Sequence, residues 1–173
     1  SWANIAMPWS MESTRRMFPF YLQFVVFHLA VAANIAMSFV IPYAPGLMKP
    51  MIVVRLLQAL FAAAVVIGCY RMYRRLSNPA MRLISTPDDL FSLGLLTVWS
   101  FASIFAAPNR PDLGEGPLLV YFIMTAFFLV YVPFSKISHY LYYPFTRFYF
   151  GKTLGYRGVY PVKHATQPKQ PHA

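Results

Sequence analysis

Two histidines within apolar segments are the residues of this sequence best suited to bind a cofactor. The chain has four histidines in 173 residues, and only His28 and His139 lie in apolar stretches. A histidine in hydrocarbon needs partners for its ring nitrogens, because an unsatisfied polar group there costs several kcal/mol. Two such histidines on separate helices could share one haem iron, for which imidazole is a common axial ligand. The alternative is that each is a hydrogen-bonding packing residue.

The other reactive residue types indicate no complete active site. Cys69 is the only cysteine, so the chain alone cannot form a disulfide or a cysteine-ligated iron–sulfur cluster. No nucleophile and base are placed together, and no glycine-rich phosphate loop is present. The sequence therefore predicts a subunit without a complete active site of its own.

The composition indicates an integral membrane protein. Apolar residues make up 58% of the chain and charged residues only 12%, about half the charged fraction of soluble domains. The 15 Lys and Arg residues against 5 acidic ones give a net charge of +10. In a membrane protein this excess indicates topology rather than nucleic-acid binding.

Four apolar stretches are long enough to cross about 30 Å of hydrocarbon as helices. They cover residues 20–42, 51–70, 89–107 and 117–147, and proline-containing turns separate them. The sequence predicts an all-α, four-helix transmembrane bundle over residues 1–158, followed by a basic tail over 159–173.

The distribution of cations predicts which side the termini face. Twelve of the 15 Lys and Arg residues lie in the N-terminal segment, in the loop 71–88 or from residue 136 onward, and the other three are Lys49, Arg55 and Arg110. Because cytoplasmic loops are enriched in Lys and Arg, both termini are expected in the cytoplasm.

The depth of the two histidines depends on where the fourth helix ends. His28 lies twelve residues after Arg16, about 18 Å along a helix. If the fourth helix continued to Arg147, with a kink at Pro144, His139 would lie about 12 Å deep. Both histidines would then occupy the cytoplasmic half of the bundle.

Lys136 precedes His139 by three residues and would share its helix face. At that depth its ammonium needs either an anion, such as a haem propionate, or a route to the headgroups. We predict Lys136 as a cofactor-binding residue, with extension to the interface as the alternative.

Several motifs match one family. They are Phe27-His28, the segments 73–79 and 85–90, and Pro133-Phe134-Ser135-Lys136-Ile137-Ser138-His139. From about Phe20 to Gly158 the chain resembles the gamma-type membrane cytochrome b subunit of respiratory nitrate reductase. That family also includes the membrane subunits of sulfite-reductase-associated and heterodisulfide-reductase-like complexes. The resemblance implies that His139 and His28 ligate the haem nearer the cytoplasm.

One departure from the family changes the expected cofactor content. Two-haem members carry a second histidine pair, which in this numbering would fall at positions 38 and 121. Ser38 and Tyr121 occupy these positions, and neither is a usual ligand of haem b. We therefore expect one haem b.

The resemblance implies a membrane-anchoring b-type cytochrome subunit of a respiratory oxidoreductase complex. It would pass electrons between the quinone pool and an iron–sulfur partner subunit, which serves a catalytic subunit. The expected location is a bacterial or archaeal plasma (inner) membrane, with lipid but no nucleic acid as a further partner. Lys49 falls near a quinone-contacting lysine of the family, with an interfacial anchor as the alternative. The alternative function is a haem-free membrane anchor or scaffold of such a complex.

Overall fold

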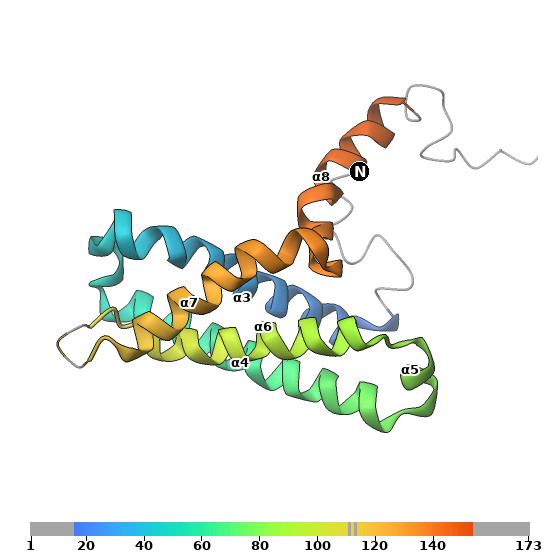
Figure 1. Cartoon of the computed structure of the whole chain (residues 1–173), viewed down its shortest axis with the longest axis horizontal. Helices are drawn as coiled ribbons and strands as arrows, with labels where there is room; N and C mark the ends of the chain where they lie inside the picture. Colours follow the sequence, from blue (N-terminus) through green and yellow to red (C-terminus); the bar gives the residue numbers. More distant parts are fainter. Residues whose placement is uncertain (1–15, 111, 113, 154–173) are drawn as a thin grey trace, which may run out of the picture.

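The computed structural model describes residues 16–110, 112 and 114–153. Four long helices lie along a common direction (Figure 1): α3 (Phe18–Tyr43), α4 (Met51–Ser77), α6 (Pro87–Ala106) and α7 (Gly116–Tyr131). The shorter elements are η2 (Pro45–Met48), α5 (Pro79–Ile84), η4 (Val132–Phe134), η5 (Lys136–Ser138) and α8 (His139–Thr153). No strand occurs in these described ranges. The predicted tail 159–173 lies outside them.

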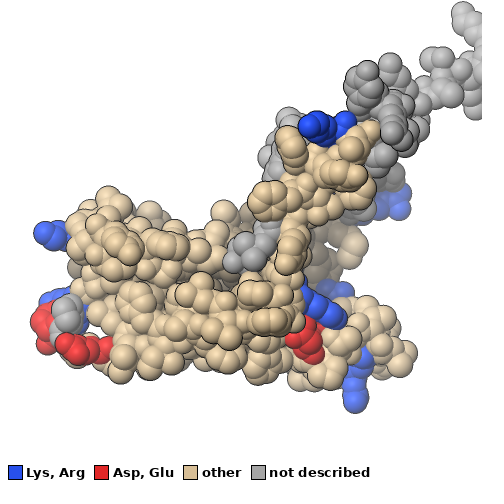
Figure 2. Space-filling view, turned by 45° about the horizontal axis from the view of Figure 1, so that its top comes forward, with Lys and Arg blue, Asp and Glu red and all other residues tan. Residues whose placement is uncertain are grey.

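Four helices are long and apolar enough to cross a membrane, as the sequence predicted. They are Phe18–Tyr43, Met51–Ser77, Pro87–Ala106 and Gly116–Phe134. Their central parts carry no Lys, Arg, Asp or Glu, since the stretches 17–48, 56–70, 90–109 and 116–135 contain none. Figure 2 shows charged side chains at the two ends of the bundle and a broad uncharged surface between them. The chain is a multi-pass membrane protein.

The two ends of the bundle differ in what they contain. The histidine end is formed by the starts of α3 and α6 and by the ends of α4 and α7 (Figure 1). The opposite end, called the lysine end after Lys49, is formed by the connections 44–50 and 107–115.

Close packing of α4 on α6 forms the centre of the bundle. A Cβ atom at Gly68 of α4 would overlap the hydroxyl of Thr97 on α6, so glycine permits this approach. On the other side of α6, the rings of Trp99 and Tyr121 stack with centroids 6.1 Å apart. The Tyr121 hydroxyl donates to the Asn34 carbonyl oxygen at 2.6 Å and ties α7 to α3. Small residues and buried hydrogen bonds thus hold the helices together where lipid supplies no hydrophobic drive.

The start of α6 is fixed by local hydrogen bonds. The Thr86 hydroxyl accepts from the Asp89 N–H, and the Asp89 carboxylate accepts from the Thr86 N–H at 2.8 Å. This reciprocal pair is a capping box, and Pro87 occupies the first helical position. The negative charges of Asp88 and Asp89 also stabilise the helix by interacting with the positive end of its dipole. Pro87, Asp88 and Asp89 therefore form the first turn of α6.

The fourth spanning segment differs from the continuous helix expected over residues 117–147. After Tyr131 the chain forms the two short helices η4 and η5, and a new helix, α8, begins at His139. Pro133 has no N–H to donate to the preceding turn, which explains the break. Ser135 is extended, and its hydroxyl accepts from the Ile137 N–H at 3.2 Å to start η5. Pro144, the expected kink, lies inside α8, which points away from the four long helices (Figure 1).

Candidate haem site

His28 lies on α3, in the half nearer the histidine end, and its side chain is exposed on the bundle surface. Its Nδ1 atom is 2.8 Å from the carbonyl oxygen of Phe24, one helical turn earlier. The Phe24 ring packs against the imidazole, with ring centroids 4.0 Å apart. Because a carbonyl oxygen only accepts hydrogen bonds, Nδ1 carries the proton. The Nε2 lone pair is left for another partner.

His139 is the first residue of α8 and has the same arrangement. Its Nδ1 atom is 2.8 Å from the carbonyl oxygen of Lys136, so Nδ1 is again the donor. The side chain is exposed, and within the described part of the chain no hydrogen bond to Nε2 is formed by either histidine. Metal-bound histidines commonly donate their second ring N–H to a backbone carbonyl, which fixes the tautomer and the ring orientation.

The fold brings these two rings together, as the sequence analysis predicted. The ring centroids of His28 and His139 are 6.3 Å apart, with 64° between the ring planes. Two imidazoles on opposite sides of one iron would have ring centres about 6 Å apart, from ~2 Å per metal–nitrogen bond and ~1 Å from each nitrogen to its ring centre. The observed spacing suits one shared metal.

The donor set fits haem better than a bare metal ion. Among the described residues, no group of three or more His, Cys, Asp or Glu side chains could hold a metal ion. Two imidazoles alone leave an octahedral ion short of ligands, whereas a porphyrin supplies four nitrogen ligands and needs only two axial ones. The pair of histidines therefore fits haem in both spacing and chemistry.

Lys136 is occupied by an acidic partner in the structure. Its ammonium lies 3.1 Å and 3.2 Å from the two carboxylate oxygens of Asp89 and 2.8 Å from the Thr86 hydroxyl. The sequence indicated a haem propionate or the headgroups as the partner of Lys136, and not this carboxylate. Its assignment as a direct cofactor contact stays a prediction, and the structure shows it joining η5 to α6.

Arg71 is a second cation near the histidines, and sequence reasoning missed it. It lies on α4 with its guanidinium 6.0 Å from the ring centre of Phe27, the neighbour of His28. Arg71 is close enough to His28 for their charges to interact. It has no acidic partner within 4.0 Å among the described residues. Because α4 continues as a helix beyond the predicted end at residue 70, Arg71 lies beside Phe27 and near His28.

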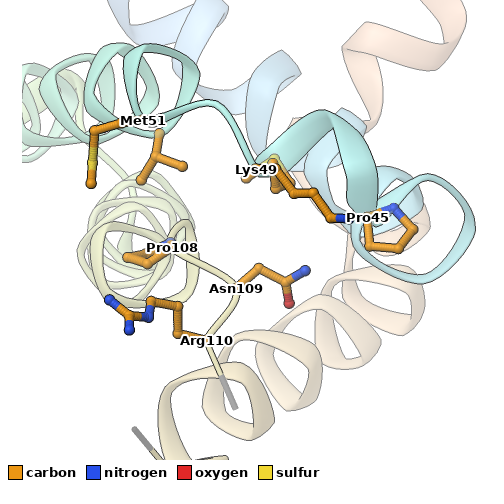
Figure 3. Close-up of a pocket in the computed structure, with 8 residues that line it drawn as sticks. Pro45, Lys49, Met51, Pro108, Asn109 and Arg110 are labelled. Atoms are coloured by element: carbon orange, nitrogen blue, oxygen red, sulfur yellow. The ribbon is translucent and has the colours of Figure 1, made fainter. Parts of the chain in front are cut away.

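Lys49 lies at the other end of the molecule. It lines a cavity of about 550 Å³ together with residues of α4, η2 and the loop after α6: Pro45, Met48, Met51, Val54, Pro108, Asn109 and Arg110 (Figure 3). From His28 to Tyr43, where α3 ends, is fifteen residues, or about 22 Å along the helix. The candidate quinone contact is thus far from the histidine pair.

Ser38 and Tyr121, which replace the family's second histidine pair, take part in helix packing. The Ser38 hydroxyl donates to the carbonyl oxygen of Ile35 at 2.7 Å. Tyr121 is fully buried, with its hydroxyl on the Asn34 carbonyl. Neither position presents a ring nitrogen to a metal, and the expectation of a single haem stays a prediction.

Sequence reasoning also missed the carboxylates that contact the segment before His139. Asp88 and Asp89 both bond to Lys136. A signal was available, because the chain has only 5 acidic residues and two of them are adjacent at the predicted cytoplasmic side. Acidic residues contribute little to the orientation of a membrane protein. Two adjacent acidic residues at the edge of a spanning segment therefore indicate a specific partner.

Fold and site together define a four-helix membrane protein with two neighbouring histidine rings toward one end of its bundle. Comparison of the chain with protein families, curated proteins and solved structures gave no match. The resemblance to the nitrate reductase gamma family therefore rests on the motifs alone.

Proposed function

We propose that this chain is a membrane-anchoring b-type cytochrome subunit of a respiratory oxidoreductase complex. It carries one haem b between His28 and His139 and passes electrons between the quinone pool and an iron–sulfur partner. The observation that carries the proposal is the pair of imidazoles with centroids 6.3 Å apart, each with Nδ1 bonded to a backbone carbonyl. That arrangement leaves two Nε2 lone pairs for one iron.

The residues around the pair suit electron transfer rather than catalysis at the metal. Haem, when bound, supplies a one-electron carrier. His28 and His139 would hold the haem from two sides, so the iron would have no position left for a substrate. The carbonyls of Phe24 and Lys136 hold the two rings in the required tautomer. Arg71, beside Phe27, would be one cation available to a propionate on this side of the bundle.

The charge distribution supports a cytoplasmic position for the histidine end. Most Lys and Arg residues lie in segments that precede or follow the helices at this end, as the positive-inside tendency requires. Electrons would then leave toward a cytoplasmic iron–sulfur subunit and its catalytic subunit. The proposed membrane is a bacterial or archaeal plasma membrane.

The position of the haem ligands bears on where quinone reacts. Lys49 and its cavity lie at the lysine end, more than about 22 Å along the bundle from His28. Electron transfer weakens steeply with distance, and one haem at the histidine end cannot bridge that span. We therefore favour quinol oxidation close to the histidine end, with Lys49 as an interfacial anchor.

Quinol-driven reduction tests the proposal. The purified chain, reconstituted in lipid vesicles, is mixed with a short-chain quinol, and haem reduction is followed by its visible α-band. We expect reduction by quinol to approach that obtained with dithionite. A haem reduced by dithionite but not by quinol would exclude the quinone link, and a chain that contains no haem would identify a haem-free anchor.

A further inference from the structure

The segment that carries His139 is held by the start of α6 rather than by α7. We propose that Asp88, with Asp89 beside it, is a positioning residue that sets the orientation of the His139 imidazole. The inference rests on the proposed haem ligation for its role, but the contacts that carry it belong to the chain itself.

The backbone alone does not position His139. The α-helix α7 ends at Tyr131, and the residues 132–138 form two short 3₁₀ helices separated by the extended Ser135. Such short helices have poor hydrogen-bond geometry and little stability of their own. The direction of α8 and of its first residue must therefore be fixed by contacts from elsewhere in the fold.

Asp88 supplies two such contacts, one on each side of the break between α7 and α8. One carboxylate oxygen accepts from the Tyr131 hydroxyl at 2.6 Å, at the end of α7. The other oxygen accepts from the backbone N–H of Lys136 at 3.4 Å, at the start of η5. The Ser92 hydroxyl lies 2.9 Å from the Tyr131 hydroxyl and completes the cluster. One carboxylate thus spans the interruption between α7 and α8.

Asp89 holds the side chain of the same residue. The Lys136 ammonium bonds to both of its oxygens, and the carboxylate is itself held in the capping box with Thr86. The Asp89 side chain is 19% exposed and that of Lys136 57%, so the carboxylate is the sheltered partner of a pair that is partly open to solvent. Lys136 is therefore fixed at its backbone N–H by Asp88 and at its ammonium by Asp89.

The remaining polar group of Lys136 connects this network to the proposed iron ligand. The Lys136 carbonyl oxygen accepts the proton of His139 Nδ1 at 2.8 Å. Movement of Lys136 would weaken that bond, rotate the imidazole and lower its basicity, because the hydrogen bond on Nδ1 tunes the metal-bound nitrogen. Asp88 acts on His139 through Lys136 and touches neither the ring nor the haem.

Spin-label distances test the inference without haem. Nitroxide labels are placed at Phe39→Cys on α3 and Phe145→Cys on α8, both exposed, in a Cys69→Ser background because Cys69 is exposed. Asp88→Ala removes both acceptor oxygens, whereas Asp88→Asn keeps one. We expect Asp88→Ala to shift and broaden the label-to-label distances, and Asp88→Asn to retain a distribution close to that of the unsubstituted chain. An unchanged distribution in Asp88→Ala would overturn the inference.

The haem gives a second measurement on the same variants. We expect Asp88→Ala to raise the midpoint potential and alter the low-spin electron paramagnetic resonance signal, because His139 becomes a poorer donor. Asp88→Asn separates position from charge, since it removes the same charge as Asp88→Ala. Equal changes in the two variants would mean that charge alone acts and would contradict a positioning role.

A milder variant covers the case in which Asp88→Ala does not fold. Lys136→Met removes the ammonium and leaves the backbone N–H and the α6 cap intact. We expect the same broadening of label distances to a smaller extent, and unchanged distances in Lys136→Met would reject the inference. Absence of haem from the unsubstituted chain would instead refute the proposed function, while the label distances would still decide the positioning role.

Discussion

The two ends of the bundle carry ion pairs of different kinds. At the lysine end, Arg110 and Asp112 pair at 3.2 Å with both side chains about 60% exposed, and Lys49 lines an open cavity. Exposed pairs of this type contribute about 0–1 kcal/mol. At the histidine end, Lys136 is 57% exposed but its partner Asp89 only 19%, and Asp88 joins two helices through Tyr131 and Lys136.

The difference shows where the fold needs a fixed side chain. The lysine end only has to turn the chain, and Pro45, Gly46 and Pro108 do so with local geometry. The histidine end interrupts a helix and still places His139 beside His28. Holding a side chain beyond a broken helix requires tertiary hydrogen bonds, and Asp88 and Asp89 form them here.

Loss of either histidine should have the largest effect. We expect His28→Ala and His139→Ala each to reduce haem content to near zero, since one imidazole leaves the iron without its second axial ligand. Pyridine haemochrome assay of the purified variants measures this. The matched control is His164→Ala, a histidine of the predicted tail, which should keep full haem content; full retention in the first two variants would rule out the site.

Deletion of Gly158 to Ala173 should remove the partner and keep the haem. This segment carries Lys163 and Lys169 without an acidic residue and has too little apolar content to fold alone. We expect it to become ordered on a cytoplasmic electron-transfer protein. Co-purification after the deletion, with haem measured in parallel, checks this, and an unchanged complex would assign the tail to topology alone.

Removal of the Arg71 charge should shift the haem potential by a smaller amount. A nearby cation stabilises the reduced form, so Arg71→Leu should lower the midpoint potential by on the order of tens of millivolts. Arg71→Lys keeps the charge and should shift it less. Arg110→Leu at the lysine end should leave the potential unchanged, and equal shifts for Arg71→Leu and Arg110→Leu would contradict the placement of haem at the histidine end.

Lys49→Ala should have the smallest effect. Its cavity lies more than about 22 Å from His28 along the bundle, so haem content, potential and the rate of haem reduction by quinol should all stay unchanged. A clear drop in the quinol-driven rate would show that quinone reacts at the lysine end and would require an electron carrier between the two ends.

Much of the fold could be predicted from the sequence because hydrocarbon imposes strong constraints on composition. The helices α3, α4 and α6 match predicted spans, since uncharged stretches of this length have few other stable forms. The apolar placement of His28 and His139 indicated the pair. Whether the two rings would meet depended on how far along the bundle α3 and α8 place them, and the sequence does not specify this.

The rest depended on side-chain contacts that a single sequence does not reveal. Apolar residues recur through 131–137 as Tyr131, Val132, Phe134 and Ile137, so hydropathy gave no sign that α7 would end before Pro133 and that α8 would begin at His139. The partner of Lys136 is Asp89, which lies 47 residues earlier and is brought near only by the packing of η5 on α6. Arg71 was missed because the predicted helix ended one residue too early to include it.

The proposed haem site is tested most directly by the haem content of the purified chain together with its reduced-minus-oxidised absorption spectrum. We predict a b-type spectrum and about one haem per chain, held by His28 and His139. A chain purified intact without haem, or with about two haems per chain, would contradict it.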